Sequence, residues 1–205
     1  RLREMLKQPQ NAPIPVEEQV CVIYTGINGF LDDVELDEVK GFITKLRNFL
    51  KSSASQLLST IKTEMKLYKW LLKRLSGVII NHGHFKGPFC KGHTNCTHFD
   101  FHLTFPDGFK LIIELDGPQH FYESRKFVGT SANEFIYACE RDLMKEEWAI
   151  DQELCVVRVL QEDVWYDRID WQGWLIKSIA DARVGKPHVY TPDVPEYRSS
   201  ESGYV

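Results

Sequence analysis

The sequence predicts an α-helical domain followed by an α/β domain, in which helices flank a mixed sheet. Apolar residues recur at helix spacing in the first part of the chain, and short strand-like runs replace them after about residue 76. These runs follow the order strand, hairpin, strand, helix, strand, which is typical of α/β folds. The predicted divisions are residues 1–76, residues 77–184 and a tail, residues 185–205.

Helices dominate the first part and are expected over residues 16–25, 36–51 and 55–76. The second of these helices is amphipathic, because its apolar residues share one stripe while its lysines and arginines point elsewhere. Asn28 and Gly29 indicate the turn that separates it from the first helix.

Strand-like runs in the second part occupy residues 78–80, 99–105, 109–115 and 155–160. Pro106-Asp107-Gly108 indicates a hairpin turn between the two middle runs. Two such antiparallel strands, followed by a helix and a further strand, are expected to build one sheet.

A helix over residues 132–151 is expected before the last strand, opened by Ser131 and Glu134 at the spacing of a capping box. The face expected to be buried carries Ile136, Cys139, Leu143 and Ile150. A closing helix is expected over residues 162–182, and the proline-containing tail is expected to be extended or disordered.

Composition excludes several classes of protein. The chain has 205 residues, 43% of them hydrophobic and 26% charged, which is ordinary for a globular protein, and no apolar run approaches the roughly 20 residues that span a bilayer. Five cysteines disfavour a secreted disulfide framework. The first residue is arginine, so we expect a fragment or a processed product.

Charge is unevenly distributed along the chain. The net charge is -4, yet residues 40–74 contain nine lysines and arginines against a single acid, Glu64. Two interpretations stay open, a solvated helix face and a phosphate-binding face. The candidates for nucleic-acid contact are Lys62, Lys66, Lys69 and Lys73.

Three acids are candidates for a metal site. Asp100 lies near the start of one hairpin strand, and Glu114 and Asp116 lie two residues apart on the other, so the latter two share a face. Carboxylate oxygens are preferred ligands of Mg²⁺, and grouping them without a cation would raise their pKa values. We therefore expect Mg²⁺ or Mn²⁺ at these acids, which would activate water for attack on a phosphodiester.

Polar residues after that strand could complete a catalytic site. Gln119 and His120 follow the sharp turn at Gly117-Pro118, and histidine suits proton transfer near neutral pH. On the next helix Arg141 and Lys145 lie four residues apart beside Asp142, so both charges could reach one phosphate. A polar strand end and a solvated helix face are the structural alternatives.

A second metal site is conceivable upstream of the hairpin. Cys90, His93, Cys96 and His98 place four zinc-ligand types within nine residues. Their spacing is tighter than in common zinc fingers, so a polar loop with incidental cysteines and histidines is the alternative interpretation and is slightly favoured.

The second part resembles the PD-(D/E)XK nuclease superfamily over residues 99–165, and within it very-short-patch-repair-like and EDxHD homing endonucleases. The resemblance rests on Phe99-Asp100-Phe101, on the run from Ile113 to Phe121, on Arg141-Asp142 with Lys145, and on Val156 to Val159. It implies a restriction-endonuclease-like fold and DNA hydrolysis, with the active-site roles falling on Asp100, Glu114, Asp116, His120 and Asp142. Asp116 replaces the usual strand lysine, so Lys145 or Arg141 would have to supply the cation.

The string Asp-Gly-Pro-Gln-His-Phe at residues 116–121 is also similar to RAP domains, which are RNA-binding relatives found in organelles. This resemblance implies an alternative, a non-catalytic RNA-binding or structural component of an organellar complex. The presence of both Asp100 and Asp142 favours the nuclease.

Residues 1–66 resemble the carboxy-terminal domain of the F-type ATP synthase alpha subunit, on Arg1 to Gln10, Pro15 to Val20, Ile23 to Gly26 and Asn28 to Asp32. The likeness is greatest to plastid and cyanobacterial versions, so an organelle is expected, a plastid before a mitochondrion, with ATP synthase subunits as partners. No phosphate-binding loop follows the Gly-x-x-x-x-Gly-Lys pattern, so ATP hydrolysis is not expected. A homing endonuclease read in frame with an invaded host gene would produce this order of domains.

Overall fold

A computed structural model describes residues 2–5, 7, 13–89, 96–121 and 132–198, without the side chains of residues 2, 119 and 132–135. The chain forms two compact units, Arg1–Met65 and Lys66–Val205. The division falls inside helix α4 (Ser55–Arg74).

The first unit is helical. It contains α1 (Leu2–Met5), α2 (Val16–Ile27), α3 (Val39–Ser53) and the first half of α4. Gly29, at φ +78°, forms the turn that the sequence indicates after α2. The small core of this unit contains Met5, Val22, Leu31, Val39 and Ile43.

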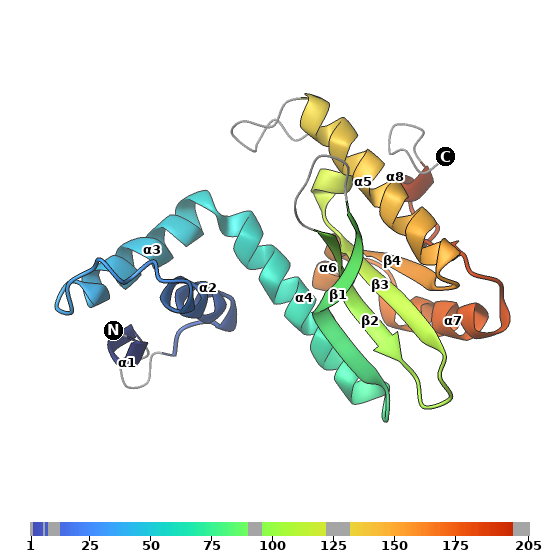
Figure 1. Ribbon diagram of the computed structural model, residues 1–205, viewed down its shortest axis with the longest axis horizontal. Coiled ribbons are helices and arrows are strands. Elements are labelled where there is room, and N and C mark those ends of the chain that lie inside the picture. The colour runs from blue at the N-terminus through green and yellow to red at the C-terminus, as the bar shows by residue number, and fades with distance from the viewer. Residues whose placement is uncertain (1, 6, 8–12, 90–95, 122–131, 199–205) are drawn as a thin grey trace. The chain divides into compact units, whose positions relative to one another are not determined.

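The second unit is an α/β fold built on a mixed five-stranded sheet, which confirms the coarse prediction (Figure 1). The strand order is β1-β2-β3-β4-β5, with β1, β2 and β3 antiparallel and with β4 and β5 parallel to β3. The strands are β1 (Ile79–Phe89), β2 (Cys96–Thr104), β3 (Lys110–Asp116), β4 (Cys155–Leu160) and β5 (Val189–Tyr190). Gly108, at φ +87°, completes the predicted hairpin turn between β2 and β3.

β1 is far longer than the run of residues 78–80 that the sequence indicates. Gly83, Gly87 and Pro88 interrupt the apolar alternation, and glycine and proline are depleted in strands. The structure accommodates them because β1 is an edge strand, with irregular register after His82 and after Lys86.

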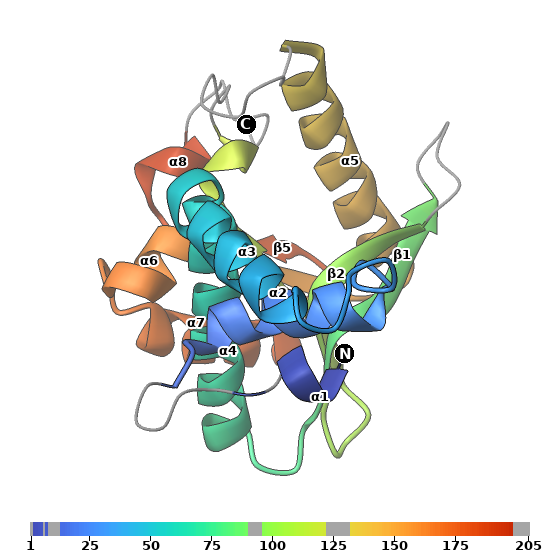
Figure 2. The same cartoon turned by 90° about the vertical axis from the view of Figure 1, so that its left-hand side faces the viewer.

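Helices cover both faces of the sheet. One face packs against the second half of α4, through Leu67 and Leu71, and against α7 (Trp171–Val184). The other face packs against α5 (Ala132–Asp151), where Ile112 meets Ala149. Figure 2 shows α5 and α7 on opposite sides of the strands. Residues of opposite parity along a strand therefore face different helices.

The closing helix predicted over residues 162–182 is wrong in one respect, because two helices occupy this region. α6 (Gln161–Tyr166) ends at Asp167, whose φ of +51° is left-handed, and α7 begins after Asp170. The Asp170 carboxylate accepts a hydrogen bond from the backbone N–H of Gly173 at 3.0 Å, which stabilises the new helix start.

The prediction of an extended or disordered tail is also wrong for part of the tail. β5 adds a parallel strand beside β4, and the short helix α8 (Pro195–Arg198) follows. Val194 and Tyr197 are buried against Phe121 and Leu160, so this segment belongs to the core of the second unit.

α5 has the predicted bounds but turns the opposite face inward. Ile136, Leu143 and Ile150 are 55%, 42% and 37% exposed, whereas Asp142 and Lys145 are buried. The charged side chains face inward because the sheet presents charged partners to them, Glu114 to Lys145 and Arg158 to Asp142. The capping residue Ser131 and the Glu134 side chain lie outside the described residues.

Two sequence expectations concern the whole chain. Within the described residues, no helix is both long enough and apolar enough to cross a membrane. Four cysteines fall in the described part, namely Cys21, Cys96, Cys139 and Cys155, and all four are free thiols.

Candidate functional site

The predicted acids meet where β2 and β3 separate. The backbone ladder between these strands ends at the pair Phe101 and Ile113. Beyond it, the N–H of Asp100 donates to Glu114 Oε1 at 3.3 Å, and the N–H of Leu115 donates to Asp100 Oδ2 at 2.7 Å. Carboxylates thus replace backbone acceptors at the strand ends, which brings Asp100 and Glu114 together on the α5 side.

Lys145 reaches this pair of acids from α5. Its Nζ donates to Glu114 Oε2 at 2.7 Å and lies 4.7 Å from the centroid of the Phe99 ring. Burial and the charge of Asp100 raise the pKa of Glu114 from 4.5 to about 7, although Lys145 and Arg158 oppose this shift. The surroundings of Glu114 therefore disfavour the ionised form of its carboxyl group.

Because the pKa of Glu114 is raised, we expect the unfolding free energy of the chain to depend on pH. EDTA is included so that no bound metal ion contributes. Between pH 4.5 and about 7 the folded chain binds more protons at Glu114 than the unfolded chain, so the unfolding free energy falls as the pH rises. A shift from 4.5 to about 7, at 1.36 kcal/mol per pH unit, corresponds to about 3 kcal/mol. In the Glu114→Gln variant, the unfolding free energy measured by urea denaturation should lose this fall between pH 4.5 and pH 8. The exposed variant Glu140→Gln should keep it, and equal slopes in both variants would contradict the assignment.

Arg158 forms a second set of contacts on the same face. Arg158 is 1% exposed and lies opposite Glu114 in the backbone register of β3 and β4. Its guanidinium donates to both carboxylate oxygens of Asp116, at 2.5 and 2.7 Å. It also donates to Glu146 at 2.6 Å and to Asp142 at 3.4 Å. One buried guanidinium therefore holds carboxylates from β3 and α5 together.

His120 lies on the short 3₁₀ turn Pro118–His120, and its ring contacts Asp142 of α5. Its Nδ1 is 2.5 Å from Asp142 Oδ2. Burial opposes a charge on His120, but the hydrogen bond to Asp142 and the charge of Asp116 raise the pKa of His120 above its usual value. For Asp142, burial is likewise outweighed by His120 and Arg158, which hold the pKa of that carboxyl far below its usual range. Asp142 thus orients the ring and leaves Nε2 as the nitrogen suited to proton transfer.

Two helical turns of α5 carry the inward polar face. Asp142, Lys145, Glu146 and Ala149 follow the i, i+3, i+4, i+7 spacing of one helix side. Together these contacts form a charged cluster that consists of Asp100, Glu114, Asp116, His120, Asp142, Lys145, Glu146 and Arg158.

The charged cluster has more acids than bases. Five carboxylates surround two permanent cations, Lys145 and Arg158, together with His120. Buried acids in excess over cations favour binding of a further positive ion. Asp100 and Glu114 fit a Mg²⁺ ion that keeps several of its waters, since one or two carboxylates commonly suffice for such a site.

Asp116 fits the metal less well than the sequence suggests. Arg158 binds both of its oxygens, and the hydroxyl of Tyr197 donates to Oδ2 at 2.5 Å. Within the described residues, no three His, Cys, Asp or Glu side chains form a group that could hold a metal ion. Asp116 is therefore the counter-ion of Arg158 in this structure.

Other predicted residues lie apart from the charged cluster or outside the described set. Arg141 is exposed on α5. Lys66, Lys69 and Lys73 are on α4, which covers the opposite face of the sheet, and Lys66 bonds Asp167 at 2.9 Å. Lys62 belongs to the first unit and lies 4.0 Å from Glu17. The described structure includes neither Cys90, His93 nor the Gln119 side chain, but includes Cys96 and His98 in β2.

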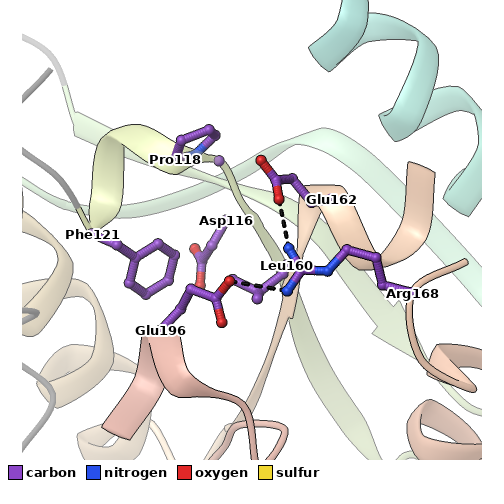
Figure 3. Close-up of a pocket in the computed structure, with 8 residues that line it drawn as sticks. Asp116, Pro118, Phe121, Leu160, Glu162, Arg168 and Glu196 are labelled. Atoms are coloured by element: carbon purple, nitrogen blue, oxygen red, sulfur yellow. Dashed lines mark hydrogen bonds and ion pairs between the residues drawn. The ribbon is translucent and has the colours of Figure 1, made fainter. Parts of the chain in front are cut away.

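A pocket of about 240 Å³ opens beside the charged cluster, at the carboxyl ends of β3 and β4 (Figure 3). It shares Asp116 with the cluster. The remaining lining residues are Gly117, Pro118, Phe121, Leu160, Glu162, Arg168 and Glu196.

Sequence reasoning missed Arg158, Glu146 and Tyr197 as parts of the site. Arg158 had a usable signal, since a lone arginine inside the six-residue apolar strand Cys155–Leu160 must be paired if the strand is buried. Glu146 completes the polar spacing of α5. Tyr197 comes from the tail, and no local pattern links it to Asp116.

Comparison with known proteins finds a similarity for one part of the chain. The family model for the ATP synthase alpha/beta chain, C terminal domain, matches residues 1–82. This match confirms a likeness to the ATP synthase alpha/beta family for the segment noted, residues 1–66, and extends it through α4 into β1. No solved structure matches the chain.

Proposed function

We propose that the second unit is a metal-dependent endonuclease that hydrolyses DNA phosphodiesters. We also propose that its fold is restriction-endonuclease-like. One observation carries the proposal. Six residues predicted to be catalytic come from four separate segments, and all six lie in the charged cluster, linked by direct contacts and through Arg158. They are Asp100, Glu114, Asp116, His120, Asp142 and Lys145.

The proposed roles follow from the contacts. Asp100 and Glu114 would hold Mg²⁺ or Mn²⁺, and the bound ion would supply Lewis-acid activation of the phosphate and of an attacking water. His120, oriented by Asp142, accepts a proton from that water at Nε2. Arg158 keeps Asp116 and Asp142 in place.

Lys145 is our candidate for the cation that the strand lysine supplies elsewhere in the superfamily. Its Nζ lies 2.7 Å from a proposed metal ligand, Glu114, whereas Arg141 is exposed on the same helix. A buried ammonium at this position can stabilise the negative charge that develops on the phosphate.

The direct test is cleavage of double-stranded DNA with Mg²⁺ or Mn²⁺. The wild-type chain is expected to cleave, and Glu114→Gln and Asp100→Asn are expected to lower the rate at least a hundredfold, because each removes a proposed metal ligand. EDTA should abolish cleavage. Glu140→Gln, on the exposed side of α5, is the matched control. Equal rates in all four proteins would contradict the proposal.

A second candidate is a non-catalytic organellar component that binds RNA or ATP synthase subunits. Two observations favour it, the saturation of Asp116 by Arg158 and Tyr197, and the match of residues 1–82 to an ATP synthase domain. The first unit also leaves an apolar side of α2 exposed, at Val16, Val20, Ile23, Tyr24 and Ile27.

Two measurements separate the candidates. Binding to nucleic acid through many phosphates weakens steeply with salt, so a flat salt response would favour a structural role. Co-purification with ATP synthase subunits, lost when Ile23→Asp disrupts the apolar side of α2, would favour docking on that complex. In either case we propose an organellar location, with the plastid preferred.

A further inference from the structure

Helix α2 exposes only apolar side chains. The structure describes this helix throughout, and five of its residues are exposed. Their exposed fractions are 46% for Val16, 42% for Val20, 40% for Ile23, 58% for Tyr24 and 67% for Ile27. An apolar side on a surface helix is typical of a contact with another helix.

The other side of α2 is packed within the first unit. Val22 belongs to the core of that unit. Glu18, which is 3% exposed, accepts a hydrogen bond from Arg47 of α3 at 2.6 Å. The helix is therefore held in place without a partner, so binding on its apolar side would not cost the entropy of ordering it.

Four of the exposed residues have the spacing of a coiled-coil seam. They are separated by four, three and four positions, which is the alternation of d and a positions in a heptad. They are Val16, Val20, Ile23 and Ile27. This spacing is the same in both chain directions. Two antiparallel copies of α2 would therefore place Val16 opposite Ile27. The inner pair would be Val20 opposite Ile23, so every position of the seam would meet an apolar partner.

The charges at the two ends of α2 favour the same antiparallel arrangement. Lys51 and Lys62, which are 53% and 50% exposed, lie at its amino end, 3.2 Å from Glu18 and 4.0 Å from Glu17. The segment after its carboxyl end carries five exposed acids, Asp32, Asp33, Glu35, Asp37 and Glu38. An antiparallel pair brings the basic end of each copy toward the acidic end of the other, whereas a parallel pair would bring like charges together.

We propose that α2 forms a dimer interface, in which it packs antiparallel against α2 of a second copy of this chain. The same residues serve both copies, as in any twofold interface. Tyr24, whose ring stacks on that of Phe30 with 6.4 Å between centroids, adds apolar area beside the seam. One helix face per copy is small for a stable interface, so we expect dimerisation at micromolar rather than nanomolar concentrations. The proposal does not depend on the nuclease function proposed above.

Sedimentation equilibrium of the full chain, without metal or DNA, measures this association over a series of concentrations. The wild-type chain is expected to change from monomer to dimer as its concentration rises. Val20→Glu and Ile23→Lys are each expected to weaken the dimer roughly tenfold or more, because each buries a charge in the seam without a partner. Phe49→Glu, at an exposed apolar residue of α3, is the matched control and should leave the dimerisation constant unchanged. Circular dichroism checks that all variants fold.

A mixture of the Val20→Glu and Ile23→Lys variants tests the antiparallel register. In that register the two introduced charges lie opposite each other and have opposite signs, so the mixture should dimerise more tightly than either variant alone. In a parallel register each charge would face an apolar residue, and mixing would gain nothing. A mixture that dimerises no better than the single variants therefore overturns the antiparallel interface.

Two further outcomes would overturn the proposal. One is a monomer at every concentration, including the case in which α2 binds an ATP synthase subunit or the second unit of its own chain instead. The other is a dimer that neither single substitution weakens, because its interface would lie elsewhere. Either result leaves the nuclease assignment standing.

Discussion

Arg158→Met is expected to lower the unfolding free energy of the second unit by about 3–5 kcal/mol, because it leaves buried carboxylates without their shared cation. Arg158 is 1% exposed and contacts Asp116, Asp142 and Glu146. Methionine keeps the length of the side chain and removes its charge. Urea denaturation followed by tryptophan fluorescence measures the change.

Arg198→Met is the matched control for this effect. Its ion pair with Asp193 joins side chains that are 62% and 85% exposed, so solvent screens most of their interaction. We expect little change in this variant. A loss below about 1 kcal/mol in Arg158→Met would mean that the buried carboxylates do not depend on the guanidinium.

His120→Ala is expected to slow DNA cleavage by roughly 10²–10⁴-fold, which is the usual contribution of general acid-base catalysis. Asp142→Asn should slow it less, because the ring stays in place while its orienting partner changes. The maximal single-turnover rate at saturating DNA is the appropriate measurement, since it separates chemistry from binding.

His84→Ala serves as the control for His120→Ala, since His84 is an exposed residue of β1 and does not belong to the charged cluster. Circular dichroism should give the same spectrum for all of these variants. A cleavage rate for His120→Ala within threefold of the wild-type rate would exclude His120 as the general base and would leave the nuclease assignment itself standing.

The sequence predicted those parts of the fold that short-range patterns determine. The bounds of α5 and β4 and the hairpin turn at residues 106–108 agree with the structure, because periodicity and turn residues act locally. The meeting of Asp100 with Glu114 also followed from a local argument, since the hairpin places one opposite the other. Lys145 and Asp142 fall on that side because α5 packs on that face of the sheet.

The orientation of α5 was not predictable by the same reasoning. An apolar stripe usually marks the buried face, yet Ile136, Leu143 and Ile150 are exposed here. The polar face is buried because Arg158 and Glu114 lie beneath it, and those residues come from strands that the helix sequence does not reveal. The contact between Tyr197 and Asp116 spans 81 positions and is likewise invisible to local patterns.

The position of α4 also bears on where this chain can be divided. Leu67 and Leu71 fill the core of the sheet, yet both lie in the segment that matches the ATP synthase family. The end of that match, at residue 82, is therefore not the boundary of a folding unit. A chain that begins at residue 83 would lack both leucines and the first residues of β1, so we expect it not to fold.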